Sequence, residues 1–153
     1  PRLIAVQAAG CAPIAEAFSK GASVVVPWTG PVDTKAAAIA DRLEGYVQDG
    51  TRVLDIVRES QGRVDAVTDA EMASARAALL QFDGIDAEFS SCAGVAFLMR
   101  NREIAVEGTI CIVTASGYKH TFSGDVPTPT PDPVTAVRLR DFFVDDHYIE
   151  VLG

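Results

Sequence analysis

Apolar residues along the chain recur with two spacings, and segments of the two kinds alternate. An apolar run at residues 3–8, interrupted only by Gln7, is typical of a buried strand in a parallel sheet, and residues 63–67 are predicted to form a short strand. The β-branched run at residues 109–114 predicts the clearest strand, and residues 23–27 form a further candidate. Spacings of three and four residues predict helices at residues 12–20, 51–60, 68–82 and 90–101, with a turn and a short helix within residues 34–43. This alternation predicts an α/β fold, a three-layer αβα arrangement around a mostly parallel sheet.

The ends and inner faces of these helices are also marked in the sequence. Thr68 followed by Glu71 has the pattern of a capping box, and Gly84 is expected to end the helix that this box starts. Ser90 or Ser91 can cap the next helix. Two buried stripes are predicted, one of Val53, Leu54 and Val57 and one of Met72, Ala75, Leu79 and Leu80.

Domain organisation follows from a change in composition after Gly117. We expect one compact domain over residues 1–122, because 153 residues are too few for two domains with separate cores. The alternating prolines between Val126 and Pro133 predict an extended connector. Residues 123–153 are therefore a Pro-rich connector and tail, in which residues 135–143 are a candidate helix and residues 145–153 a candidate strand.

Composition excludes some classes of function. Apolar residues make up 48% of the chain, enough for a buried core, and the formal net charge of −8 argues against nucleic acid as a partner. No apolar run approaches the ~20 residues of a membrane-spanning helix. The cysteines, an odd number at wide spacings, suit neither a disulfide framework nor a zinc site, which favours a reduced, cytoplasmic protein: Cys11, Cys92 and Cys111.

Three segments combine strand or helix ends with small or polar residues. Residues 6–14 join a strand to a helix through Gly10, and strand–helix packing explains them better than ligand binding. Residues 84–94 place a carboxylate before Ser-Ser-Cys, which suits either a bound anion or ring nitrogen, or a helix cap followed by a small buried cysteine. Residues 109–119 end a strand at Thr114, whose hydroxyl can bind a neutral heterocyclic nitrogen. Thr68, Asp69 and Glu71 are interpreted as capping residues only.

The order of these motifs resembles the threonine synthase family of fold-type II pyridoxal-phosphate (PLP) enzymes. The resemblance covers residues 3–119 without large gaps. It rests on Val-Gln-Ala-x-Gly-Cys-Ala-Pro, Thr-x-Ala-x-x-Ile-Ala, Arg-Glu-Ser-x-Gly, Ala-Val-Thr-Asp-x-Glu, Gly-Ile-x-x-Glu-x-Ser-Ser-x-Ala and Val-Thr-x-x-Gly-x-Lys. Members of the family convert O-phosphohomoserine and water into threonine and inorganic phosphate, so the resemblance implies a PLP-dependent lyase of threonine biosynthesis.

The resemblance also implies roles for particular residues. Thr114 occupies the position that contacts the pyridine nitrogen of PLP, and a hydroxyl there leaves the ring largely unprotonated. Ala38 and Ile39 match a segment near the cofactor ring, and Glu88 matches a carboxylate near the site. The expected cofactor-binding residues are thus Thr114, Ala115, Ala38, Ile39 and Glu88, with no catalytic residue and no metal ligand among them. Ala115 stands where the family usually has Gly, and Phe89 where it usually has Pro.

The resemblance makes this chain the C-terminal part of such an enzyme, residues 1–122 belonging to its catalytic domain. None of the lysines lies in the Ser-x-Lys-Asp-like context of the family's Schiff-base lysine: Lys20, Lys35 and Lys119. The phosphate-binding glycine loop is not found in the sequence either. The implied partners are the missing N-terminal half, a small amino-acid substrate and a second copy in a homodimer. The chain alone is expected to be inactive.

Other readings stay open. The parent protein can be another fold-type II PLP enzyme, either a dehydratase or a β-replacement enzyme such as cysteate synthase. The chain can also be a non-catalytic module that kept this half of the fold and binds a partner at an exposed sheet edge. A catalytic amine at Pro1 is not supported by the pattern from Gln7 onward.

Overall fold

A two-stranded parallel sheet lies at the centre of the computed structural model, which describes residues 1–119. Strand β1 (Ile4–Ala8) pairs with strand β2 (Arg63–Val67) in a continuous register from Ile4 opposite Arg63 to Ala8 opposite Val67. Both strands were predicted from the sequence, and both are confirmed. The parallel pairing requires a long crossover, which the segment between the strands supplies.

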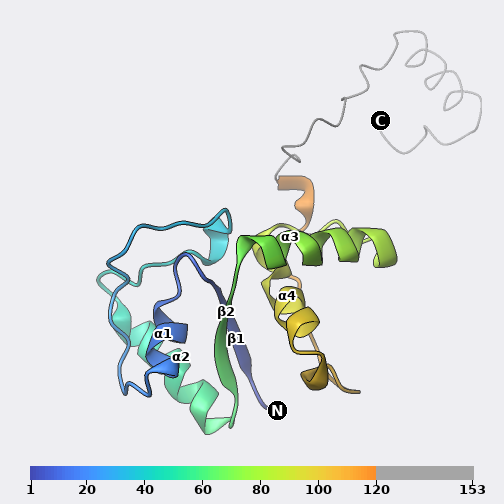
Figure 1. Ribbon diagram of the computed structural model, residues 1–153. Coiled ribbons are helices and arrows are strands. Elements are labelled where there is room, and N and C mark those ends of the chain that lie inside the picture. Colours follow the sequence, from blue (N-terminus) through green and yellow to red (C-terminus); the bar gives the residue numbers. More distant parts are fainter. Residues whose placement is uncertain (120–153) are drawn as a thin grey trace, which may run out of the picture. The chain divides into compact units, whose positions relative to one another are not determined.

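Helices α1 (Pro13–Ser19) and α2 (Val47–Glu59) cover one face of this sheet, as Figure 1 shows. Gln7 starts α1, because its Oε1 accepts hydrogen bonds from the backbone amides of Ile14 and Ala15 at 2.9 and 3.0 Å. The layer between these helices and the sheet is apolar throughout its buried residues: Ala12, Ala15, Ala17, Val25, Leu43, Leu54, Val57 and Val64.

Helices α3 (Asp69–Ala78) and α4 (Ala93–Arg100) cover the opposite face (Figure 1). The predicted capping box is present, since Thr68 Oγ1 accepts from the Glu71 amide and the Glu71 carboxylate accepts from the Thr68 amide. A π-helical turn η2 (Leu79–Asp83) extends α3, and Gly84 ends it at φ +67°. The buried apolar residues of this layer are Ala8, Ala36, Val67, Met72, Ala75, Leu79, Ala87, Cys92, Ala93, Ala96 and Phe97.

The remaining helical segments are single turns. They are η1 (Ala37–Ile39), η3 (Ser90–Cys92), η4 (Arg102–Ile104) and η5 (Gly117–Lys119). With helices on both faces of a parallel sheet, the predicted α/β class and three-layer arrangement are confirmed.

The residues at the centre of each predicted inner helix face are buried, whereas residues at the edges of these faces are partly exposed. Leu54 and Val57 are buried, but Val53 beside them is 36% exposed. Leu80, predicted to point inward, is 45% exposed, because the π-helical turn changes the angular spacing of side chains after Ala78.

The β-branched run at residues 109–114 is not a strand, which corrects the strongest strand prediction. The side chains of Ile110 and Ile112 are 87% and 75% exposed, and this segment pairs with no strand in the described part of the chain. A β-branched sequence favours extended backbone, but a strand also needs a neighbour for its hydrogen bonds. The same reason applies to residues 23–27, which form no strand and bury only Val25.

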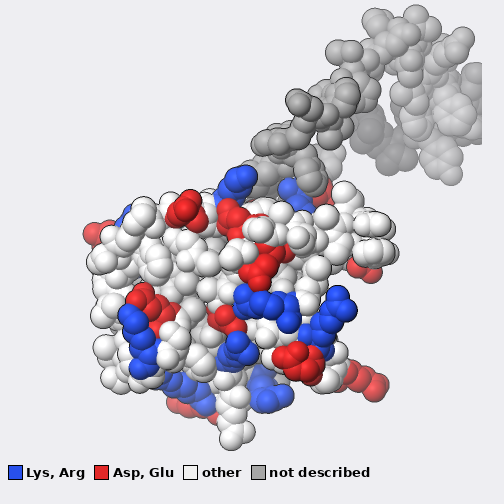
Figure 2. Space-filling view, viewed as in Figure 1, with Lys and Arg blue, Asp and Glu red and all other residues white. Residues whose placement is uncertain are grey.

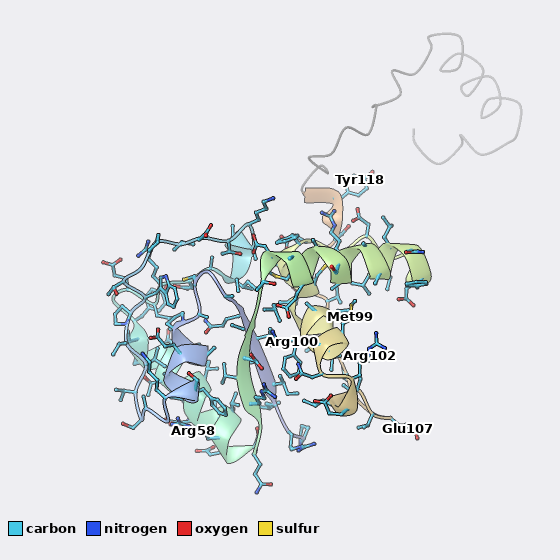
Figure 3. All side chains as sticks on the ribbon, viewed as in Figure 1. Arg58, Met99, Arg100, Arg102, Glu107 and Tyr118 are labelled. Atoms are coloured by element: carbon cyan, nitrogen blue, oxygen red, sulfur yellow. The ribbon has the colours of Figure 1, made fainter. Side chains whose placement is uncertain are left out.

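The outer edge of β2 is covered by side chains from two elements. Arg100 reaches from α4 toward β2 (Figure 3), and both of its terminal nitrogens donate to the carbonyl oxygen of Ala66 at 3.1 Å. The amide of Ala66 donates to Oδ1 of Asp65 at 2.8 Å. These bonds occupy both backbone groups of Ala66, which limits pairing of this edge with another strand.

Acidic and basic side chains are interspersed on the face shown in Figure 2, with no single basic patch. Among residues 1–119, no helix has the length and apolar character needed to span a bilayer. The predicted helix and strand of the tail lie outside the described residues. The proposed boundary after residue 122 stays a prediction.

Candidate functional site

Four of the five residues expected to contact the cofactor are brought together by two serines that precede α4. Ser90 and Ser91 are both buried, at 4% and 9% exposure. The hydroxyl of Ser90 accepts a hydrogen bond from the Ala38 amide at 3.3 Å and donates to Oε1 of Glu88 at 3.2 Å. Segments more than 50 residues apart in the sequence therefore meet at Ser90.

Ser91 makes the matching connection to Thr114 and Ala115. Its Oγ lies 3.0 Å from Oγ1 of Thr114 and accepts a hydrogen bond from the Ala115 amide at 3.1 Å. A backbone bond from the Glu88 amide to the Ala115 carbonyl, 2.9 Å long, holds the two segments together. We call the set Ala38, Glu88, Ser90, Ser91, Thr114 and Ala115 the serine cluster.

Close backbone approach helps to fix the serine cluster. Ala87 and Ser116 form an antiparallel bridge, and the Gly117 amide donates to the Asp86 carbonyl at 2.9 Å. A Cβ at position 117 would lie 2.2 Å from Oδ1 of Asp86, so glycine lets this carboxylate keep its position. Gly117 thereby anchors the residues that follow Thr114.

Glu88 is the buried carboxylate of the cluster, with 6% exposure. Its Oε1 accepts from the Ser90 hydroxyl, and its Oε2 accepts from the Ser91 amide at 3.2 Å. The carboxylate is thus directed at the two serines, and it organises the turn that carries them.

Arg76 brings a positive charge next to this turn. It lies in α3 with 7% exposure, and one terminal nitrogen forms an ion pair with Oδ1 of Asp86 at 2.9 Å. Burial raises the pKa of Cys92 to about 11, against the opposing effect of the Arg76 charge. Cys92 is therefore an inert thiol at neutral pH, as its interpretation as a small buried hydrophobe requires.

Sequence reasoning missed the serine cluster and Arg76. Ser90 and Ser91 were interpreted as helix caps, but neither side chain caps α4. For Arg76 a signal was available: it follows Met72 by four residues and precedes Leu79 by three, so helical spacing places it on the inner face of α3.

The remaining predicted residue, Ile39, directly follows Ala38 but takes no part in the hydrogen bonds of the serine cluster. It is half-buried in η1 and packs against the apolar core beneath α3 and α4. The short helix is held from the other side by Asp69, whose carboxylate accepts hydrogen bonds from the Thr34 hydroxyl and the Lys35 amide. Asp69 thus positions the segment that carries Ala38 and Ile39, in addition to starting α3.

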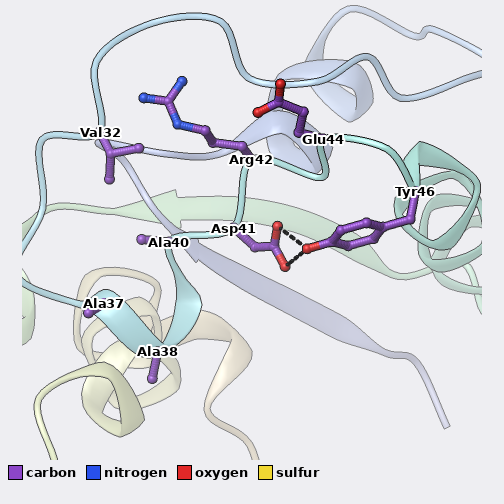
Figure 4. A pocket seen from close by; sticks show the side chains of 8 residues that line it. All are labelled: Val32, Ala37, Ala38, Ala40, Asp41, Arg42, Glu44 and Tyr46. Atoms are coloured by element: carbon purple, nitrogen blue, oxygen red, sulfur yellow. Dashed lines mark hydrogen bonds between the residues drawn. The ribbon is translucent and has the colours of Figure 1, made fainter.

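An open cavity of about 370 Å³ borders the cluster at Ala38 (Figure 4). Its polar wall is formed by Asp41, Arg42, Glu44 and Tyr46, and Ala37 and Ala38 lie across from them. The Tyr46 hydroxyl donates to the Asp41 carboxylate at 2.7 Å, and this hydrogen bond is the main cause of a raised pKa of Tyr46. Tyr46 is therefore a neutral hydrogen-bond donor at neutral pH.

The serine cluster fits one side of a pyridine ring. Thr114 is exposed and offers a neutral hydroxyl, and the neighbouring Ala38 and Ala115 add no charge or bulk. Glu88, the nearest buried carboxylate, is directed at Ser90 and Ser91. No group of three or more candidate metal ligands occurs within residues 1–119.

Comparison with known proteins agrees with this arrangement. The family described as "Pyridoxal-phosphate dependent enzyme" matches residues 1–116. Threonine synthase of Methanocaldococcus jannaschii is 35% identical over 145 residues, which cover 92% of this chain and 32% of that protein. Threonine synthase of Methanosarcina acetivorans is 36% identical over 118 residues, 74% of this chain and 28% of that protein. The chain spans about a third of the length of these curated relatives.

Solved structures with the same fold are more distant in sequence. The crystal structure of a T.th. threonine deaminase aligns with a TM-score of 0.58 and 15% identity, over 79% of this chain and 41% of that one. Maize serine racemase aligns with a TM-score of 0.55 and 17% identity, over 94% of this chain and 39% of that one. The family match covers the sheet, all its covering helices and the serine cluster, and the cofactor of this family is pyridoxal phosphate: the chain belongs to the pyridoxal-phosphate dependent enzymes.

Proposed function

We propose that this chain is the C-terminal part of a threonine synthase, which converts O-phosphohomoserine and water into threonine and inorganic phosphate. One structural observation carries the proposal: Ser91 holds the hydroxyl of the exposed residue Thr114 next to the segment that contains Glu88. The identity of 35% with a threonine synthase over 92% of the chain supports this reaction among those of the family.

In this proposal the chain binds the ring of the cofactor and leaves its covalent attachment to another part of the parent protein. When bound, PLP supplies the electron sink that stabilises negative charge on the substrate carbon. The Thr114 hydroxyl would donate a hydrogen bond to the ring nitrogen, and a hydroxyl, unlike a carboxylate, would leave that nitrogen unprotonated. Ala38 and Ala115 would lie next to the ring without adding charge, and Ile39 would support the segment that carries Ala38.

The lysines of this chain are not assigned to the cofactor. Lys20 is engaged with Glu16 on the surface of α1, and the Lys35 amide is anchored to Asp69. We expect the chain alone, incubated with PLP and reduced with borohydride, to show no stoichiometric adduct on Lys20, Lys35 or Lys119 by peptide mass spectrometry. A single fully modified lysine among them would overturn this assignment.

The activity is tested in the complete parent protein. With O-phosphohomoserine we expect release of phosphate and threonine in equal amounts, and Thr114→Val should lose activity while Thr114→Ser keeps most of it, because only the valine removes the hydroxyl. Ammonia release from serine or threonine without phosphate release from O-phosphohomoserine would identify a dehydratase instead. Equal activity of Thr114→Val and the unmodified enzyme would reject the role of Thr114.

A further inference from the structure

Ser91 has more polar connections than a residue that only starts a helix needs. Its amide donates to the carbonyl oxygen and to Oε2 of Glu88, at 3.0 and 3.2 Å. Its hydroxyl contacts two groups of the segment that carries Thr114, the Ala115 amide and the Thr114 hydroxyl. Because the residue is 9% exposed, its backbone and side chain are fixed from both sides.

Counting protons leaves two possible directions for the hydrogen bond between the two hydroxyls. Each hydroxyl has one proton to donate and two lone pairs that accept. Ser91 Oγ already accepts the Ala115 amide, which uses one lone pair and leaves its proton available. Thr114 has a single proton, so it donates either to Ser91 or to a group outside the chain.

The two directions have different consequences. If Thr114 donates to Ser91, its exposed side presents only lone pairs, and these cannot bind the lone pair of a neutral ring nitrogen. If Ser91 donates to Thr114, the Thr114 proton is free to point outward. The second direction also aligns the donors from Ala115 through Ser91 to Thr114, and each bond in such a chain strengthens the next.

We infer that Ser91 is a positioning residue that donates to Thr114 and so directs the Thr114 proton at the ring nitrogen of the cofactor. This inference rests on the proposed function, in which Thr114 contacts that nitrogen. In this arrangement Ser91 favours the unprotonated form of the ring, because a protonated ring nitrogen has no lone pair to accept a hydrogen bond from Thr114. Ser91 itself touches neither cofactor nor substrate in this arrangement.

The contacts of Ser91 are tested first without cofactor, by amide hydrogen exchange followed by NMR on the chain. Ser91→Ala should accelerate exchange of the Ala115 amide about tenfold, since a bond worth ~1–1.5 kcal/mol is removed. Ser90→Ala is the matched control, because Ser90 bonds Ala38 and Glu88 but not Ala115. It should accelerate exchange at Ala38 and leave Ala115 unchanged. An unchanged Ala115 rate in Ser91→Ala would overturn the inference.

The positioning role is tested in the complete parent protein loaded with PLP, by titrating the cofactor's absorption spectrum with pH. Thr114→Val should shift the midpoint of this titration, and Ser91→Ala should shift it in the same direction by a smaller amount. Ser91→Thr, which keeps the hydroxyl, should restore the midpoint. A shift in Thr114→Val without any shift in Ser91→Ala overturns the role of Ser91 alone. No shift in Thr114→Val overturns the proposed contact of Thr114.

Discussion

Helices α1 and α2 cover one face of the sheet with a purely apolar layer, whereas the layer beneath α3 and α4 adds buried polar side chains to its apolar core. All four buried polar or charged residues found within residues 1–119 belong to the second layer: Arg76, Glu88, Ser90 and Ser91. Burial of a polar group costs free energy unless hydrogen bonds replace those lost to water. One face of the sheet is thus packed with apolar side chains alone, and the other also holds buried polar side chains that are joined by hydrogen bonds.

The pleat of the strands produces this separation. Val64 of β2 points toward α1 and α2, while Asp65 and Val67 point toward α3 and α4. Most surface ion pairs follow the same division, since Asp65 and Glu71 both bind Arg100 on the α4 side. The same strand thus supplies an apolar surface to one layer and anchoring charges to the other.

Truncation of one fully buried side chain in each layer tests whether only the layer beneath α3 and α4 affects the position of Ala115. Leu54→Ala and Met72→Ala should each lower the free energy of unfolding by ~2–5 kcal/mol, because both side chains are 0% exposed. Urea denaturation of the chain measures this loss. Amide exchange at Ala115 should rise locally in Met72→Ala only, relative to global unfolding. A local rise in Leu54→Ala as well would show that the layers are coupled.

Removal of a charge from each layer gives a smaller and more selective effect. Arg76→Met should lower the free energy of unfolding by ~2–3 kcal/mol, because Asp86 loses its ion-pair partner. Arg58→Met on α2 is the control, since Arg58 only lies over the ring of Phe18, at 5.8 Å from its centroid. It should cost ~0.5–1 kcal/mol. Urea denaturation measures both losses. Equal losses in the two variants would show that Arg76 contributes no more to stability than Arg58 does.

The sequence predicts the regular part of the fold well, for a physical reason. Strands β1 and β2 have their hydrogen-bonding partner within the described chain, and both were predicted from the sequence. Residues 109–114 have the stronger β-branched pattern but no paired neighbour there, and they are not a strand. Strand pairing depends on residues far away in the sequence, which a local pattern does not contain.

The set of candidate site residues was predicted only through resemblance to a family, although the Thr114 hydroxyl also stood out at the end of a predicted strand. Thr114, Ala115, Ala38 and Glu88 were named from matched motifs, and as contacts of the cofactor they stay predictions. Ser91 was interpreted as a cap because a serine before an apolar helical stretch is the usual cap. Its hydroxyl instead contacts Thr114, 23 residues later, and no local pattern encodes a contact at that separation.

Among the variants that compare the two layers, a change in the capping box of α3 should have the smallest effect, because this box lies on the exposed side of the layer beneath α3 and α4. Burial opposes a lower pKa of Glu71, but hydrogen bonds from the Thr68 amide and hydroxyl and the charge of Arg100 outweigh it. A lowered folded-state pKa means that the unfolded chain takes up this proton first as the pH falls. The stabilisation is thus complete above the unfolded pKa of about 4.3 and is lost as the pH falls through the lower folded-state pKa.

Glu71→Gln should therefore lower the free energy of unfolding by up to ~1 kcal/mol at pH 7, and the difference from the unmodified chain should shrink below about pH 4. Urea denaturation at a series of pH values measures it. Glu16→Gln on α1 is the control from the apolar layer, since Glu16 pairs only with the neighbouring Lys20 on an exposed helix surface. Its difference should be smaller at every pH. A difference for Glu71→Gln that does not change with pH would mean that the carboxylate acts through its hydrogen bonds and not through its charge. The ion pair of Glu71 with Arg100 would then add nothing to the stability of this layer.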